Sequence, residues 1–184
     1  MVSREIPTLD IYRSPGNYMV VNVVILAASS GNNLTLANRF HETFMDKNVQ
    51  SQIVELTKLD WPVYTPELEH NPDLSPDTGS LSDLMIGASA FVVCAPEYNG
   101  LVPPCLNNSI AWLSVQCDDF RFLFNNKTVL LATHSGGGGA NCLMAMRQQF
   151  SHLGSNVIGR SMTLNKTKTF SQSTMDDLVN RVMQ

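Results

Sequence analysis

The sequence predicts a single α/β domain built on a parallel β-sheet with helices on both faces. Short, continuous apolar runs alternate along the chain with longer segments whose apolar residues recur every three or four positions. Runs that are apolar on both faces are typical of buried parallel strands, and the helices between them make the crossovers. The 184 residues are 43% hydrophobic and 15% charged, which indicates one substantial core and argues against disorder.

The chain begins with an extension over residues 1–18, which we interpret as a flexible segment or an arm that contacts a second subunit. Residues 19–184 then form the domain, and its first strand is predicted at 20–27. The apolar run at 19–28 is too short to span a bilayer, and the first residues lack the apolar core of a signal peptide. We therefore expect a cytoplasmic protein that does not enter a membrane.

A small polar loop follows the first strand and leads into a helix predicted at 34–47. Free backbone N–H groups and the positive end of a helix dipole would meet there, which suits a phosphate. The alternative is that the polar side chains only cap the helix. The candidate phosphate-binding residues are Ser29, Ser30, Gly31, Asn32 and Asn33.

The next part of the chain contains a second strand at 50–56, a proline-rich loop at 57–80 and a short helix at 81–88. A loop of that length is often functional or part of an oligomer contact. Trp61 and Tyr64 could cover a ligand, although we expect them to anchor the loop.

The third strand is predicted at 90–95, and a tight loop follows it. Proline fixes φ and glycine permits positive φ, which together favour a turn. Pro103 and Pro104 then open a helix, because proline is tolerated in the first helical turn. The loop consists of Pro96, Glu97, Tyr98, Asn99 and Gly100.

A fourth strand at 127–133 leads into a glycine-rich loop and a helix at 140–153, after which Gly154 is the expected C-terminal cap. Consecutive glycines are entropically costly unless something approaches the backbone closely, so this loop either contacts a ligand or is only a flexible turn. His134 could donate a proton or simply form loop hydrogen bonds. The candidate ligand residues are Ser135, Gly136, Gly137 and Gly138.

The chain ends with a short last strand within 156–164 and a helix that a capping box at 173–176 opens. Five strands of this kind fit the flavodoxin-like three-layer order 2-1-3-4-5, whose switch point lies between strands 1 and 3. The serine-asparagine loop, the loop at 96–100 and the glycine-rich loop would therefore border one crevice. Together they indicate a site for a phosphate and a planar ring.

Composition excludes several other classes of function. The net charge of −4 gives no basic surface for nucleic acid. The four cysteines form no CxxC pair and fall in predicted strands and helices, so we interpret them as buried thiols of a reducing compartment.

The stretch from Pro96 to Gly100, continued through Pro103, Asn108 and 112–114, resembles the motif of the NADPH-dependent FMN reductase family. The resemblance covers about residues 20–164. The chain departs from the family in its first loop, which is shorter and lacks an arginine, and in Asn107 and Ala111, where lysine and aspartate are common.

The resemblance implies a flavodoxin-like FMN reductase. Ser29 to Asn33 would hold the FMN phosphate, Pro96 to Gly100 would border the isoalloxazine and ribityl chain, and Ser135 to Gly138 would line the other side of the ring. NADPH or NADH would be the co-substrate, a small molecule such as a flavin, quinone, azo compound or metal oxyanion the acceptor, and a homodimer or homotetramer the assembly. Because the flavin performs the chemistry, we expect no catalytic side chain and no metal.

Two alternatives remain at this stage. One is a flavodoxin-type electron carrier, although flavodoxins are usually more acidic than this chain. The other is a structural or regulatory module that kept the fold without NAD(P)H activity, since a fold alone does not determine function.

Overall fold

The computed structural model describes residues 23–184, so the predicted extension at 1–18 and the first positions of strand 1 lie outside the described residues. The strands are β1 Val23–Ala27, β2 Ser51–Glu55, β3 Ala90–Cys94, β4 Thr128–His134, β5 Asn156–Val157 and β6 Met162–Leu164. The helices are α1 Asn32–Asp46, the 3₁₀ turn η1 Leu56–Lys58, α2 Pro66–Glu69, α3 Gly79–Gly87, α4 Pro104–Ser114, α5 Ala140–His152 and α6 Gln172–Val182.

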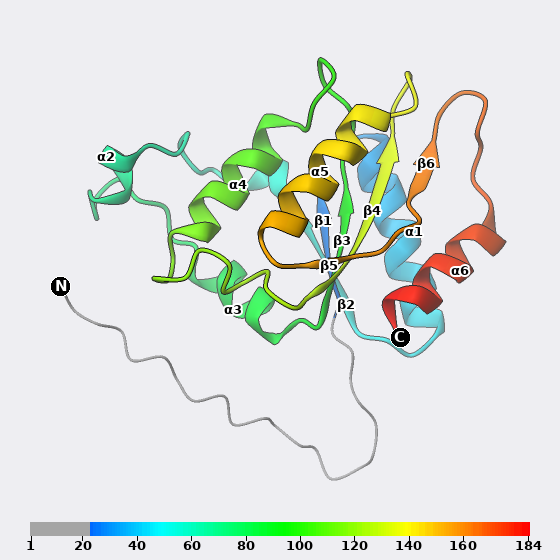
Figure 1. Ribbon diagram of the computed structural model, residues 1–184, viewed down its shortest axis with the longest axis horizontal. Coiled ribbons are helices and arrows are strands. Elements are labelled where there is room, and N and C mark those ends of the chain that lie inside the picture. Colours follow the sequence, from blue (N-terminus) through cyan, green and yellow to red (C-terminus); the bar gives the residue numbers. More distant parts are fainter. Residues whose placement is uncertain (1–22) are drawn as a thin grey trace, which may run out of the picture.

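The sheet runs in the order β2-β1-β3-β4-β5, and every pair of strands is parallel. This confirms the predicted order. Helices α4 and α5 cover one face of the sheet, while α1 and α6 lie on the other (Figure 1). The carboxyl ends of the strands meet at one edge, as they must in a parallel sheet with right-handed crossovers.

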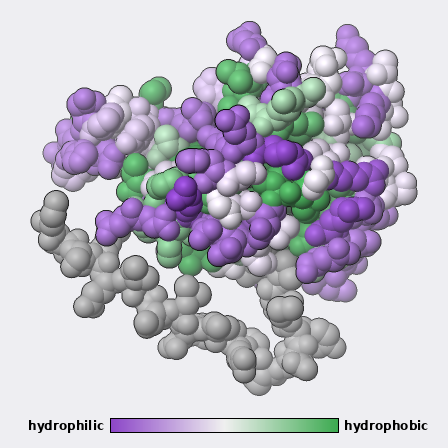
Figure 2. Space-filling model, viewed as in Figure 1, coloured by the Kyte–Doolittle hydropathy of each residue, from purple (hydrophilic) through white to green (hydrophobic). Residues whose placement is uncertain are grey.

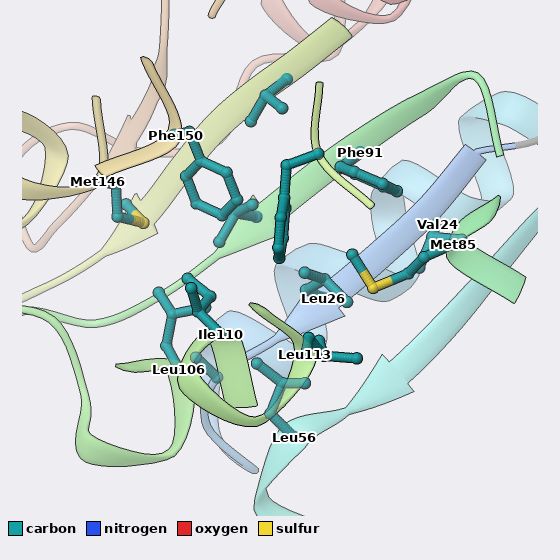
Figure 3. Packing of buried hydrophobic residues seen from close by; sticks show 14 of the residues in the cluster. Val24, Leu26, Leu56, Met85, Phe91, Leu106, Ile110, Leu113, Met146 and Phe150 are labelled. Atoms are coloured by element: carbon teal, nitrogen blue, oxygen red, sulfur yellow. The ribbon is translucent and has the colours of Figure 1, made fainter. Parts of the chain in front are cut away.

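The core consists of two hydrophobic layers, one on each face of the sheet. Along β1, Val24 and Leu26 belong to the layer beneath α3, α4 and α5, whereas Val23 and Ile25 belong to the layer beneath α1 and α6. This is the alternation expected of a strand buried on both faces. Figure 3 shows Phe91 and its neighbours in the first layer. The two layers fix the strand ends from which the site loops leave.

The last strand differs from the prediction, because it is split into β5 and β6, which pair with the two halves of β4. The connector between them makes no regular ladder. The Arg147 guanidinium donates to the carbonyls of Ile158 and Gly159 at 3.0 and 3.3 Å, so part of the interrupted backbone is satisfied from α5.

The predicted capping box at 173–176 is wrong. The N-terminal cap of α6 is Ser171, whose hydroxyl accepts a hydrogen bond from the Thr174 amide at 3.4 Å. The predicted loop at 57–80 is also more ordered than expected. It contains η1 and the one-turn helix α2, which Thr65 caps, and α3 begins within it at Gly79.

Hydrophilic side chains dominate the surface over α6, while the surface around α5 mixes both kinds (Figure 2). Over residues 23–184, no helix combines the length and apolar character needed to cross a bilayer.

Candidate functional site

A cleft of about 400 Å³ opens at the carboxyl ends of the strands, where the crossovers of β1 and β3 diverge. This is the switch point at which ligands bind in open α/β sheets. The wall is made by the loop after β1, the loop after β3, the start of α4 and the end of β4. The lining residues are Ala28, Ser29, Ser30, Gly31, Asn32, Asn33, Thr57, Pro96, Tyr98, Pro103, Pro104, Cys105 and His134.

Helix α1 presents its N-terminus to this cleft. The helix begins two residues earlier than predicted, because the Gly31 carbonyl already accepts the Thr35 amide at 3.1 Å. The amides of residues 32–34 precede that bond, and no described side chain caps them. No acidic residue occupies the first turn, so the end of the helix dipole is not neutralised there. An anion is the complementary guest.

The loop after β3 is a two-residue hairpin. Tyr98 and Leu101 exchange backbone hydrogen bonds of 3.0 Å in both directions. Asn99 and Gly100 both have positive φ, at 52° and 79°, as in a type I′ turn. The Tyr98 ring is half exposed beside the cleft. The hairpin therefore places Tyr98 in the same cleft as the N-terminus of α1.

The glycines after β4 fall into two groups. Gly138 and Gly139 have positive φ, and a Cβ at Gly139 would lie 2.6 Å from Thr133 Oγ1, so the fold requires glycine there. Gly136 and Gly137 have negative φ, and nothing lies within 4 Å of a Cβ built on either. Neither backbone nor packing demands glycine at these two positions. Glycine at these positions is compatible with an open backbone surface for a ligand and with a flexible turn.

Hydrogen bonds tie the loop after β3 to the loop after β4. The Glu97 amide donates to Ser135 Oγ at 2.6 Å, and Ser135 Oγ lies 3.1 Å from Thr133 Oγ1. The Glu97 carboxylate accepts the Cys142 amide at 3.1 Å. That carboxylate occupies the N-terminus of α5, so α5 is already capped by an anion while α1 is open. Glu97 and Ser135 thus support the loops through their own contacts.

Asn33 connects α1 to the end of β4. Its side-chain oxygen accepts the His134 amide at 2.8 Å, and its side-chain nitrogen donates to the His134 carbonyl at 3.0 Å. Both ends of the Asn33 amide are therefore used within the protein. Its backbone N–H, in the first turn of α1, is the candidate phosphate donor of this residue.

The loop after β2 is fastened to α4. The Pro62 carbonyl accepts from Trp112 Nε1 at 2.7 Å and from Asn108 at 3.0 Å, and the Tyr64 ring meets the Trp112 ring edge-on at 5.2 Å. Trp61 packs against the core beneath. These contacts confirm that Trp61 and Tyr64 anchor the loop rather than line the cleft.

The thiols near the site are protonated at neutral pH. Burial, helped by the Glu97 carboxylate, raises the pKa of Cys142 to about 11, and burial raises the pKa of Cys105 and Cys94 as well. None of the three offers a thiolate nucleophile. The prediction that all four cysteines are buried in strands and helices is wrong for Cys117, which is exposed beyond α4, where it does not contribute to the core.

The structure brings the predicted loops together, but not every predicted residue lines the cleft. Ser29 to Asn33, Pro96 and Tyr98 do so, whereas Gly100 lies in a separate hollow of about 590 Å³ beside Met144 on α5. The remaining predicted residues are not among those that line the cleft: Glu97, Asn99, Ser135, Gly136, Gly137 and Gly138.

Sequence reasoning missed some of the lining. Cys105 and the two prolines before it line the cleft because the N-terminus of α4 follows the hairpin directly. Thr57 lines the cleft from η1, which follows the edge strand β2, and no local sequence pattern indicates this position.

The donors of the cleft fit the phosphate of a flavin mononucleotide. The open N-terminus of α1 suits the phosphate, and the serine and asparagine loop adds neutral donors. The half-exposed Tyr98 suits a flat ring. No carboxylate lines the cleft to repel the phosphate.

Comparison with known proteins agrees with this geometry. The sequence pattern of the NADPH-dependent FMN reductase family matches residues 21–169. The chain belongs to this family. The family resemblance inferred from the motif at 96–114 is thereby confirmed.

Curated relatives of this FMN reductase family member include a quinone reductase of Escherichia coli K12, which is 32% identical over 103 residues, 55% of this chain and 53% of that protein. An NADPH azoreductase of Bacillus sp. OY1-2 is 27% identical over 116 residues, 63% of this chain and 62% of that protein. The matched part therefore spans between about half and three fifths of these relatives' length.

Solved structures share the fold. The NAD(P)H:acceptor oxidoreductase FerB of Paracoccus denitrificans has a TM-score of 0.68 at 17% identity, covering 90% of this chain and 98% of that one. An NADH:FMN oxidoreductase, EmoB, in its apo form has a TM-score of 0.66 at 16% identity, covering 88% of each chain. A flavodoxin of Pseudomonas aeruginosa has a TM-score of 0.62 at 13% identity, covering 89% and 100%. The flavodoxin-like fold is thus confirmed.

Proposed function

We propose that this chain binds FMN in the cleft and catalyses the reduction of a small-molecule acceptor by NADPH or NADH. The observation that supports this most strongly is the uncapped N-terminus of α1 in the cleft, together with two glycines of the loop after β4, Gly136 and Gly137, that the fold itself does not require. A quinone, an azo compound or a free flavin is the acceptor class that the relatives' names suggest.

In this proposal the amides of residues 32–34, with Ser29 and Ser30, hold the FMN phosphate. Tyr98 and the hairpin support one side of the ring, and Gly136 and Gly137 allow the other side to approach the backbone. Bound FMN supplies the hydride chemistry between NAD(P)H and the acceptor. The protein binds the cofactor, orients it and leaves one ring face accessible.

The test is a titration of the purified protein with FMN, followed by an assay of NADPH and NADH oxidation with a quinone as acceptor. We expect saturable binding and turnover with at least one nucleotide. Gly136→Leu should abolish both, because its side chain would fill the ligand's space. Gly159→Leu is the matched control, since Gly159 also has open space around a Cβ but lies on the connector after β5.

A protein that binds no FMN would contradict the proposal. A protein that binds FMN but oxidises neither nucleotide would favour the electron carrier or the module without NAD(P)H activity that the sequence left open.

The oligomeric state is part of the same proposal. Leu101 and Met144 are 60% and 70% exposed, and both border the hollow over α5, which supports a contact between two copies there. Sedimentation should show a homodimer or homotetramer, and a monomer at micromolar concentration would contradict this.

A further inference from the structure

We propose that the His134 imidazole is the cation that faces the cofactor's phosphate, and that it makes FMN affinity depend on pH. This inference rests on the proposed function, because it concerns a residue of the same cleft. Among the described residues that line the cleft, His134 alone can carry a positive charge.

The register of β4 sets the direction of the His134 side chain. Val129 and Leu131 belong to the layer beneath α4 and α5, while Leu130 and Ala132 belong to the layer beneath α1 and α6. Alternation along a strand therefore places His134 on the α1 face, at the carboxyl end of the sheet. That is the side on which the open N-terminus of α1 stands.

Two further contacts hold His134 at this place. Asn33 binds both its amide and its carbonyl, at 2.8 and 3.0 Å, from the first turn of α1. On the other side, His134 pairs with Leu164 of β6. The backbone of His134 is thus fixed relative to the amides that would hold the phosphate, and the half-buried His134 is part of the cleft wall.

The other titratable groups named below are neutral, are bound elsewhere or lie outside the cleft lining. Tyr98 and Cys105 line the same cleft and are neutral when protonated. The Glu97 carboxylate is bound to the Cys142 amide at α5, on the opposite face of the sheet. Lys166 and Lys168 lie in the loop after β6, outside the cleft lining, and the first turn of α1 carries no acidic residue.

A phosphate dianion beside an imidazole favours the protonated ring, so binding of FMN should take up protons near neutral pH. Riboflavin, which has the same ring and no phosphate, should take up none. The contrast separates a phosphate contact from a general effect of His134 on the cleft.

The experiment is calorimetric titration of the full chain with FMN and with riboflavin at pH 6 to 8, in buffers of different ionisation enthalpy. For the wild type we expect proton uptake with FMN alone. In His134→Gln this uptake should vanish and FMN affinity at pH 6 should fall about fivefold, as for a partly exposed ion pair, with riboflavin affinity unchanged. His70→Gln, an exposed histidine in the loop after β2, is the matched control and should behave as wild type.

Equal proton uptake in wild type and His134→Gln would overturn the role of His134 while leaving the FMN site intact. Wild-type protein that binds no FMN at all would overturn the proposed function, and this inference with it. The wild-type measurement needs no variant, so a folding defect in His134→Gln would not hide the result.

Discussion

Gly136 and Gly139 are near neighbours in one loop, yet the fold requires glycine only at position 139. Gly139 has φ of 69° and has no room for a Cβ beside the buried Thr133, whereas Gly136 has negative φ and open space. The two positions therefore separate what the fold requires from what a ligand would require.

The first prediction compares Gly136→Ala with Gly139→Ala. Gly139→Ala should lower the free energy of unfolding by about 1–3 kcal/mol, because alanine is strained at positive φ and would clash with Thr133. Gly136→Ala should leave it unchanged or raise it by up to about 1 kcal/mol, because alanine restricts the unfolded chain. Urea denaturation followed by tryptophan fluorescence measures both, and equal destabilisation would contradict the distinction.

At the residue scale, the sequence predicted the loops but not how each side chain is used. Asn33 is a predicted phosphate-binding residue, yet its side-chain amide is bound to the amide and carbonyl of His134. Glu97 was expected at the ring, yet its carboxylate caps α5. Partners distant in sequence decide these contacts, and a local pattern does not contain them.

At the scale of elements, α1 and β4 are joined by the Asn33 contacts across a long separation in sequence. Asn33→Ala should cost about 1–3 kcal/mol, since it leaves a buried N–H and a carbonyl without these partners. It should also weaken FMN binding, because the N-terminus of α1 is no longer held beside β4. Asn38→Ala is the control, because this exposed residue bonds only within its own helix, to Leu34. Loss no greater than in the control would contradict the prediction.

A lysine that directly precedes β4 binds the C-terminal end of α3. Lys127 Nζ donates to the carbonyls of Ile86, at 3.1 Å, and Ala88. Lys127→Met should lower the free energy of unfolding by about 1 kcal/mol, because these carbonyls lose a donor. Lys58→Met, on an exposed ion pair with Glu55, is the control and should change it little.

The same lysine gives a pH dependence with a definite sign. Burial lowers the pKa of Lys127 below its ordinary 10.5, so in the alkaline range between the two values the unfolded chain binds more protons than the folded one. Stability contributed by this group therefore rises with pH through that range. The free energy of unfolding of the wild type, relative to that of Lys127→Met, should therefore rise between neutral pH and about pH 10. A constant difference in unfolding free energy would contradict this.

Elements with a strong local signal were predicted well. Asn99 and Gly100 form the tight turn expected of their residue types, and Pro104 opens α4 as its first residue. The split of the last strand was missed, because it depends on Arg147 of α5 reaching the connector carbonyls. The cap of α6 was misplaced because Ser171 and Ser173 both suit that position by composition.

At the scale of the whole molecule, the sheet order alone was enough to predict where a site would form. Strands 1 and 3 are neighbours, so the loops after them leave in opposite directions and open a cleft. Alternating strands and helices predicted a parallel sheet, five strands fitted the flavodoxin-like order, and the position of the cleft followed from that order. Its detailed wall, including Thr57 and Cys105, required the packing of η1 and α4.

The central claim is that the loops after β1, β3 and β4 bind a single FMN molecule. The most direct test is NMR of isotope-labelled protein during titration with FMN. We predict that amides of residues 29–34, 97–100 and 135–138 shift together and saturate at one equivalent with one affinity. Shifts confined to one of these loops, or centred elsewhere in the chain, would contradict the account.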